Sequence, residues 1–236
     1  MNPAFVAGAT GYTGRAVVAA LQRAGVPCVA HVRPDSPLLA EWQARFAALG
    51  ATVDTTPWKS EAMEATLQRL RPALVFALLG TTRGRGRRAR AAHGRVENYA
   101  TVDVGLTLMT YDAARRAGST PRFVYLSSIG VRPDTRNQYL AARALVERSI
   151  MDGPLPYVIA RPSFISGPDR DEFRLGERLG AVVSDALLAV AGLFGAKRLA
   201  ARYRSTTPAI LGEALVRAAL EPEGNRVLES EELRAR

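Results

Sequence analysis

Three side chains in the stretch "SSIGVRPDTRNQYLAAR", residues 127–143, are of types that together can reduce a carbonyl group. That reaction needs a hydride, which a dinucleotide supplies, and a proton, which a tyrosine hydroxyl can donate. The ordinary pKa of tyrosine is about 10, and a fixed cation nearby lowers it by favouring the phenolate. Tyr139 and Arg143 are four residues apart and share one face of a helix, while Ser128 ends the preceding strand. We predict Ser128, Tyr139 and Arg143 as the catalytic residues.

The arginine at position 143 leaves open whether the protein catalyses this reaction. A guanidinium keeps its positive charge, so it can stabilise a tyrosinate or donate to ribose hydroxyls, but it cannot relay a proton. One interpretation is therefore an oxidoreductase in which Tyr139 is the acid and base, Ser128 holds the carbonyl and Arg143 is the electrostatic partner. Another is a protein that binds the cofactor without turnover, such as a redox sensor, regulator or assembly factor. In a third, Tyr139 is an ordinary packing residue near a helix start.

The motif "GATGYTG", residues 8–14, places Gly8, Gly11 and Gly14 three residues apart. It follows the apolar run 4–9 directly and opens a helical pattern, which is the context that a dinucleotide-binding turn requires. Glycine allows the tight turn and the close approach of backbone to a pyrophosphate, and the helix N-terminus offers N–H donors. We predict a phosphate-binding turn here, with a simple tight turn as the alternative.

The residues after the second predicted strand indicate which dinucleotide is bound. An acidic residue there favours NAD, because it binds the ribose 2′-hydroxyl. This chain has "HVRP", with Arg33 at the tip and Asp35 two residues later. A guanidinium suits a 2′-phosphate, so we predict NADP (NADPH) as the cofactor. Arg15 either assists Arg33 or is a solvated helix residue.

Short apolar runs alternate with helical patterns along the chain, which predicts repeated strand–helix units and a parallel sheet. Strands are expected at 4–9, 27–33, 51–55, 73–80, 122–128 and 156–162, with a possible seventh in "NRVLES" near the C-terminus. Helices are expected at 14–24, 36–49, 60–70, 95–117 and 137–150. We predict one α/β domain over residues 1–236, with a small substrate lobe at about 163–205 inserted near its C-terminal end.

Composition and charge restrict the other classes of function. A single cysteine, Cys28, excludes an internal disulfide, and we expect it to be a buried strand residue; no metal-ligand cluster appears in the sequence. The chain shows no signal-peptide pattern, and its most apolar late segment, 181–196, is short for a bilayer span and contains Asp185. We expect a cytoplasmic protein with no metal and no membrane partner.

The chain has a net charge of +10, and its basic residues include only two lysines. Six arginines lie in the stretch 83–95, which contains no aromatic residue on which a nucleobase could stack. We interpret this stretch as a solvated insertion beside the cofactor site; a phosphate contact or an oligomer contact is the alternative. We expect a small-molecule substrate, no nucleic acid, and a monomer or homodimer.

The chain resembles the atypical short-chain dehydrogenase/reductases, in particular the NAD(P)H-binding proteins of the NmrA-like, Tat-interacting-protein-related branch. The resemblance covers roughly residues 3–170 and rests on motifs that occur in the family's order: "GATGYTG", "LLGTTRG", "VDVGLT", "FVYLSSIG", "YLAAR" and "ARPSFISGP". It implies a Rossmann-type doubly wound parallel sheet with NADP(H) along the carboxyl edge. It also implies that Ser128 and Tyr139 match the family's catalytic serine and tyrosine. Arg143 departs from the family, which has lysine there.

The same resemblance implies a set of residues beside the cofactor. "LGTT", residues 79–82, would pass the adenosine half, and "RPSFISGP", residues 161–168, would flank the nicotinamide and the substrate. The cofactor-binding residues implied by the glycine turn, Arg33 and these motifs are Gly8, Thr10, Gly11, Tyr12, Thr13, Gly14, Arg33, Leu79, Gly80, Thr81, Ser127, Tyr139, Arg143, Pro162 and Ser163.

Overall fold

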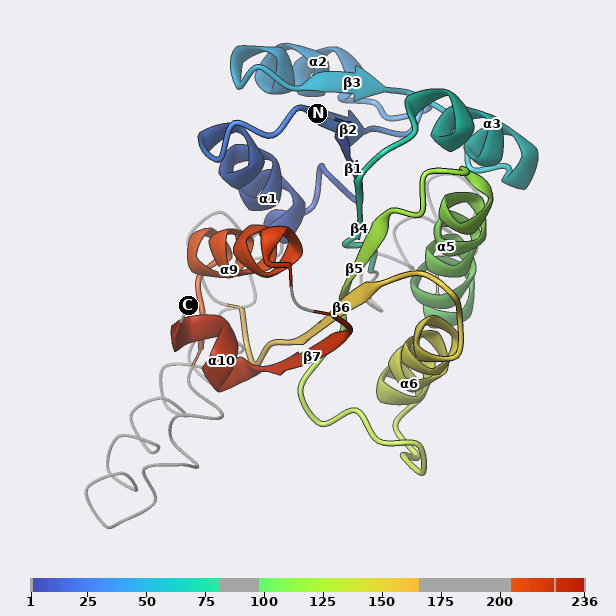
Figure 1. The fold of residues 1–236 in the computed structure, drawn as a ribbon, viewed down its shortest axis with the longest axis vertical. Coiled ribbons are helices and arrows are strands. Elements are labelled where there is room, and N and C mark those ends of the chain that lie inside the picture. Colours follow the sequence, from blue (N-terminus) through green and yellow to red (C-terminus); the bar gives the residue numbers. More distant parts are fainter. Residues whose placement is uncertain (1, 81–97, 166–204, 223, 236) are drawn as a thin grey trace.

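The computed structural model describes residues 2–80, 98–165, 205–222 and 224–235, in which strands and helices alternate (Figure 1). The first half contains β1 (Ala4–Ala7), α1 (Tyr12–Arg23), β2 (Cys28–His31), α2 (Leu39–Ala48), β3 (Thr52–Asp54), α3 (Ser60–Leu70) and β4 (Leu74–Ala77). The second half contains η1 (Tyr99–Leu106), α5 (Thr107–Arg116), β5 (Arg122–Leu126), α6 (Gln138–Met151), β6 (Tyr157–Arg161), α9 (Pro208–Leu220), β7 (Arg226–Glu229) and α10 (Ser230–Ala235). Thr81, the arginine-rich stretch 83–95 and most of the predicted lobe lie outside the described residues.

The strands form one seven-stranded parallel sheet in the order β3-β2-β1-β4-β5-β6-β7. The direction of the strand order reverses between β1 and β4, which lie side by side with Ala7 opposite Ala77. This arrangement confirms the predicted Rossmann-type sheet, and β7 confirms the possible seventh strand. In such sheets ligands bind beyond the carboxyl ends of the strands, at the point where the order reverses.

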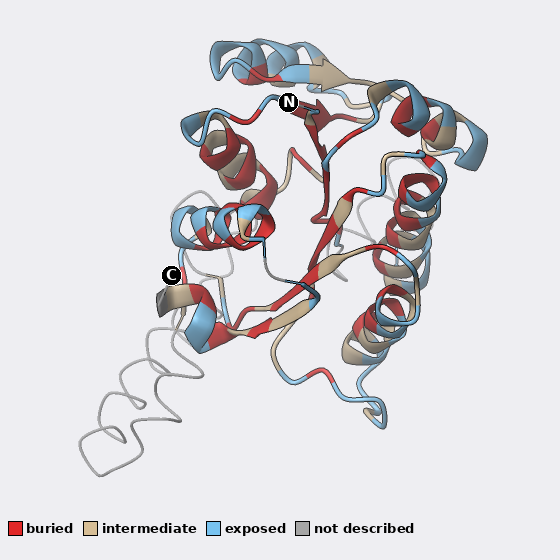
Figure 2. Ribbon diagram, viewed as in Figure 1, coloured by how far each residue is buried: buried red, intermediate tan, exposed pale blue. Residues whose placement is uncertain are grey.

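Helices cover both faces of the sheet, so its central strands are buried on both sides (Figure 2). Alternate residues of each strand enter two separate cores, because successive side chains of a strand point to opposite faces. Val6 and Phe76 pack with α1, α2 and α9, whereas Phe5 and Tyr125 pack with α3, α5 and α6. Within the described ranges, no helix is both long and apolar enough to span a bilayer.

Two helices differ from the sequence prediction. The first begins at Tyr12 rather than at residue 14, because Gly11 is its N-cap residue. The region predicted as one helix over 95–117 contains two helices in its described part, the π-helix η1 and then α5. Asn98 caps η1 through a reciprocal pair of hydrogen bonds with Thr101, and the wider π-helical turn accompanies the burial of Asp103, which is the one buried residue of η1.

Candidate active site

The glycine turn after β1 has the tight geometry that its sequence predicts. Gly8 has φ +85°, and a Cβ on it would lie 2.8 Å from the carbonyl oxygen of Leu78. A Cβ on Gly14 would lie 2.1 Å from the carbonyl oxygen of Gly8, so α1 approaches β1 more closely than any larger residue permits. The amide of Gly11 donates to the Gly8 carbonyl over 3.0 Å and closes the turn. Gly8 and Gly14 are therefore required by the backbone, whereas a Cβ on Gly11 would make only a tight contact, 3.1 Å from the Gly8 carbonyl oxygen.

The N-terminus of α1 points from this turn to the edge of the sheet where the strand order reverses. In the part of the chain that the structure describes, no side chain caps it, whereas Asn137 caps α6 and Thr207 caps α9. Thr13 is buried in the first turn, and Thr10 and Tyr12 are partly exposed beside it. A helix N-terminus concentrates N–H donors and a positive partial charge, so this end of α1 suits a phosphate group.

The two arginines predicted near the 2′-phosphate lie at the same edge. Arg33 follows β2, and its Nε lies 3.7 Å from a carboxylate oxygen of Asp35. The guanidinium of Arg15 lies over the ring of Tyr12 at 5.8 Å and over that of Trp42 at 6.0 Å. The cationic groups thus come from α1 and from the end of β2, the two elements that the prediction used.

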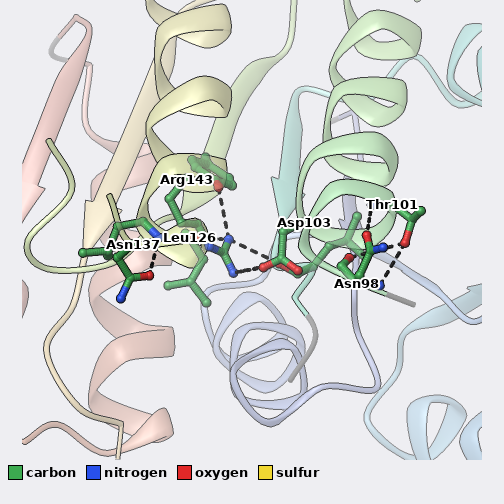
Figure 3. A network of polar contacts seen from close by, with 9 residues as sticks. Asn98, Thr101, Asp103, Leu126, Asn137 and Arg143 are labelled. Carbon is green, nitrogen blue, oxygen red and sulfur yellow. Dashed lines mark hydrogen bonds and ion pairs between the residues drawn. The ribbon is translucent and has the colours of Figure 1, made fainter. Parts of the chain in front are cut away.

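Arg143 is buried and paired with a carboxylate (Figure 3). Its Nη2 donates to Asp103 Oδ1 over 2.8 Å, and its Nη1 donates to the Leu126 carbonyl over 2.8 Å and to the Tyr125 hydroxyl over 3.1 Å. Both Nη atoms also lie 3.4 Å from the Leu79 carbonyl. The guanidinium is therefore held between the ends of β4 and β5 and the helix η1.

The electrostatics of this cluster keep the arginine charged and the phenol beside it neutral. Burial disfavours the charged guanidinium, but Tyr125, Tyr139 and Asp103 outweigh that effect and raise the pKa of Arg143 above its ordinary value. Burial raises the pKa of Tyr125 to about 12, although the Arg143 charge opposes this. Tyr125 is thus an uncharged hydrogen-bond acceptor for Arg143 at physiological pH.

Tyr139 lies next to Arg143, as the four-residue spacing predicts. The Arg143 Cζ is 5.2 Å from the centre of the Tyr139 ring, and the Tyr99 ring from η1 lies 5.4 Å away on a tilted plane. Both Nη atoms of the guanidinium are engaged by the protein itself. Its Nε is buried and has no partner among the described residues.

The two serines after β5 have different surroundings. Ser128 is partly exposed, and its hydroxyl makes one long contact, 3.4 Å, with the Ile129 carbonyl. Ser127 is buried and donates to Glu147 of α6 over 2.5 Å. Glu147 in turn accepts two hydrogen bonds from Arg161, which ends β6. Ser128 thus keeps its hydroxyl available at the carboxyl edge, whereas Ser127 anchors α6 to the sheet.

The remaining predicted residues lie along the same edge of the sheet. Leu79 and Gly80 follow β4, and Pro162 and Ser163 follow β6; all of these except Gly80 are buried. The Ser163 amide donates to Ser230 Oγ over 3.1 Å, and the Ser163 hydroxyl accepts from Arg234. The loop after β6 is therefore fastened to α10.

Sequence reasoning did not assign the three charged residues that fix this site, which are Asp103, Glu147 and Arg161. Asp103 stands in the motif "VDVGLT", and a lone acid in an apolar helical run was the available signal. Glu147 continues the four-residue spacing of Tyr139 and Arg143, so these three side chains share one face of α6.

Two buried residues of β2, Cys28 and His31, pack within the protein, and the sequence predicts this for Cys28. Burial raises the pKa of the Cys28 thiol to about 12, which makes it a poor nucleophile. His31 packs edge-on against Trp58 at 4.5 Å and bonds the Thr56 carbonyl through Nε2 at 2.7 Å. Among the described residues, no group of three or more metal-binding side chains occurs.

The residues present fit a nicotinamide dinucleotide. The glycine turn brings backbone close to the uncapped N-terminus of α1, where a pyrophosphate binds in this fold. Along the same edge, the buried Nε of Arg143 has no acceptor among the described residues and lies beside the Tyr139 ring. A buried polar group of this kind calls for a partner, which a cofactor hydroxyl or a substrate oxygen can provide.

Solved structures of low sequence identity share the fold. One is a UDP-glucose 4-epimerase from Brucella ovis in complex with NAD, which is 18% identical in sequence with a TM-score of 0.65. The match covers 97% of this chain and 77% of the epimerase chain. Another is the anaerobillin reductase ChuY from Escherichia coli O157:H7, which is 16% identical with a TM-score of 0.63. The match covers 96% of this chain and 95% of the reductase chain.

Closer relatives correct one expectation. Protein FMP52, mitochondrial, from Coccidioides immitis is 30% identical over 197 residues, which are 79% of this chain and 74% of the relative. Protein fmp52, mitochondrial, from Emericella nidulans is 33% identical over 146 residues, 61% of this chain and 57% of the relative. The expected cytoplasmic location is contradicted, because these two and two further curated relatives are all named as mitochondrial proteins.

A family model described as NAD(P)H-binding matches residues 8–189, which include the glycine turn, η1, Tyr139 and the loop after β6. The match spans well over half of the chain and agrees with the resemblance inferred from the motifs. A nicotinamide dinucleotide is accordingly the class of cofactor. The chain belongs to the NAD(P)H-binding family.

Proposed function

We propose that this protein is an NADP(H)-dependent oxidoreductase that acts on a small carbonyl or alcohol substrate. The observation that carries the proposal is the position of Tyr139 against the Arg143 guanidinium, 5.2 Å from ring centre to Cζ, on the edge of the sheet that also carries the glycine turn. A phenol beside a fixed cation, in a fold that binds a hydride donor, is an arrangement suited to carbonyl reduction.

In this proposal the side chains have separate roles. The cofactor, when bound, supplies or accepts the hydride. The Tyr139 hydroxyl gives its proton to the carbonyl oxygen during reduction and takes it back during alcohol oxidation. Ser128 donates a hydrogen bond to that oxygen, for which its hydroxyl is available, since its one contact among the described residues is 3.4 Å long. The Nε of Arg143 binds an acceptor on the cofactor or the substrate.

The preference for NADP over NAD rests on Arg33 and Arg15. Both lie at the ends of β2 and α1, where the adenosine ribose of a dinucleotide binds in this fold. A guanidinium stabilises a phosphate through charge-assisted hydrogen bonds that a ribose hydroxyl alone does not provide. Replacement of Arg33 by alanine therefore weakens the binding of NADPH more than that of NADH.

One observation favours a second function, the binding of the cofactor without turnover. The Arg143 charge is compensated by Asp103 at 2.8 Å, so the cation that would activate Tyr139 is largely neutralised. A redox sensor or regulator needs the cofactor site but not an activated tyrosine. Such a protein binds NADPH and reduces no carbonyl compound.

The test combines binding with turnover. NADPH and NADH are titrated into the full chain and followed by cofactor fluorescence, and NADPH oxidation is then measured with a panel of small aldehydes, ketones and quinones. Tyr139→Phe should keep NADPH binding and lose on the order of a hundredfold in turnover. The matched control is Tyr157→Phe at the start of β6, which should retain both.

Each outcome distinguishes the hypotheses. Equal affinity for NADPH and NADH contradicts the role of Arg33. Turnover that survives in Tyr139→Phe contradicts the catalytic assignment. Tight binding without oxidation of NADPH by any carbonyl compound in the panel favours the regulatory function.

A further inference from the structure

Asp103 is a carboxylate with no solvent exposure, which is costly unless the charge is compensated. Its partner is Arg143, and the two side chains meet at 2.8 Å with exposed fractions of 0% and 6%. Asp103 comes from η1 and Arg143 from α6, and the two residues are 40 positions apart in the sequence. The pair joins these two helices (Figure 3). The Tyr139 ring lies against the same guanidinium.

The other contacts of the guanidinium require an arginine rather than a lysine. Nη1 reaches the Leu126 carbonyl and the Tyr125 hydroxyl, while Nη2 reaches Asp103 from the same planar group. A lysine ammonium is a single point of charge on a shorter stem and cannot occupy both Nη positions at once. The acceptors around position 143 therefore match the planar, forked geometry of a guanidinium.

Gly80 closes the cluster from the end of β4. A Cβ at this position would lie 2.9 Å from Arg143 Nη2 and 3.6 Å from Asp103 Oδ1. The guanidinium cannot move away freely, because its Nη atoms are bonded on several sides. The backbone at Gly80 thus lies against the ion pair, and a larger residue there displaces it.

We propose that Asp103 is a positioning residue of this site: it fixes the guanidinium of Arg143 beside Tyr139, compensates its charge, and makes arginine the required residue at position 143. The inference rests on the proposed function and adds the residue that orients Arg143, the electrostatic partner of Tyr139. With both Nη atoms fixed, Nε is the guanidinium donor left for an acceptor on the cofactor or the substrate.

A consequence follows for the lysine that the family has at this position. Arg143→Lys does not improve the site, because the ammonium cannot satisfy Asp103 and the two β5 acceptors together. The carboxylate of Asp103 then loses the guanidinium hydrogen bond of 2.8 Å while it remains buried. Asp103→Asn in the same chain removes that buried charge, so the double variant should recover part of what Arg143→Lys loses.

The experiment is a double-mutant cycle on the full chain with NADPH affinity and thermal unfolding as its two readouts. Arg143→Lys should weaken NADPH binding about tenfold or more, which corresponds to the loss of a charge-assisted hydrogen bond. Asp103→Asn and Gly80→Ala should each weaken it several-fold, and Asp103→Asn/Arg143→Lys should bind more tightly than Arg143→Lys alone. Asp112→Asn is the matched control, because Asp112 pairs with Arg115 at 3.0 Å on the exposed side of α5.

Turnover adds a readout that a purely structural role does not move. The Tyr139 ring is faced by Tyr99 of η1 and by Arg143 of its own helix. Arg143 in turn contacts Asp103 of η1 and Tyr125 of β5. Asp103→Asn removes the one negative charge in this group, so the limb of the pH–rate profile that reports tyrosine ionisation should move to lower pH. Asp112→Asn should leave that limb in place.

Three outcomes of these experiments decide whether Asp103 positions Arg143. If the wild-type chain binds neither NADPH nor NADH, the proposed function fails, and the positioning role that rests on it is overturned with it. If the wild type binds NADPH and the Asp103, Gly80 and Arg143→Lys variants bind it equally well, the inference is overturned and the function remains. If the variants lose stability but keep NADPH affinity and the pH–rate profile, Asp103 is structural and the positioning role is overturned.

Discussion

Glu147 and Arg161 form a two-point ion pair that ties α6 to the carboxyl end of β6. Arg161 Nε and Nη2 lie 3.0 and 2.6 Å from the two carboxylate oxygens, and Glu147 is 2% exposed. Ser127 and Glu229 extend the contact to β5 and β7. Because Tyr139 and Arg143 lie on the same helix, this pair helps to set their position over the sheet.

Removal of the Glu147 carboxylate should destabilise the protein strongly. Glu147→Leu leaves the Arg161 charge with Glu229 alone, and the loss of one partner of a buried pair costs about 3 kcal/mol. Urea unfolding followed by circular dichroism measures this. The control is Glu213→Gln, whose pair with Arg23 is about half exposed and should contribute less than about 1 kcal/mol. Similar losses in both variants would contradict the argument.

The packing of α1 on β1 predicts the effect of a single methyl group. A Cβ at position 14 would lie 2.1 Å from the Gly8 carbonyl and 2.8 Å from the Ala9 Cα, so Gly14→Ala must shift backbone. We expect a loss of about 2–4 kcal/mol in unfolding free energy and weaker NADPH binding. Gly224→Ala, where nothing lies within 4 Å of the added Cβ, should change neither quantity.

Acidification should destabilise the fold through His31. Burial lowers the pKa of His31 below 6.5, and the Thr56 carbonyl and Asp54 only partly oppose this. Below pH about 6.5 the unfolded chain therefore binds a proton that the folded chain does not, so stability falls as the pH falls. In urea titrations between about pH 5 and pH 7.5, His31→Gln should show a shallower dependence than the wild type. An unchanged slope would mean that His31 titrates normally in the folded protein.

Cys28 should report unfolding. The thiol is 4% exposed, and burial raises its pKa to about 12, so the reactive thiolate is scarce in the folded protein. A thiol reagent at neutral pH should react only after denaturant is added, with a midpoint that matches the loss of secondary structure. Rapid reaction in native buffer would show that β2 opens locally.

The general fold could be predicted because its signals are local. Apolar runs bounded by turns indicate strands, and the spacing of Gly8, Gly11 and Gly14 indicates the turn between β1 and α1. The alternation of strand and helix then leaves few topologies other than a parallel sheet. The boundaries were less accurate, because the N-cap at Gly11 and the π-helix η1 depend on hydrogen bonds that periodicity does not reveal.

The sequence alone determined which segments meet at the carboxyl edge of the sheet, and therefore where Ser128, Tyr139 and Arg143 lie. Only the tertiary structure decided what Arg143 does, because its partner Asp103 is 40 residues away and reaches it through a π-helical turn. Glu147 and Arg161 meet in the same way, by the docking of a helix on a strand end. Spacing along one helix predicts which side chains share a face, whereas a buried charge is paired by whichever element the fold packs against it.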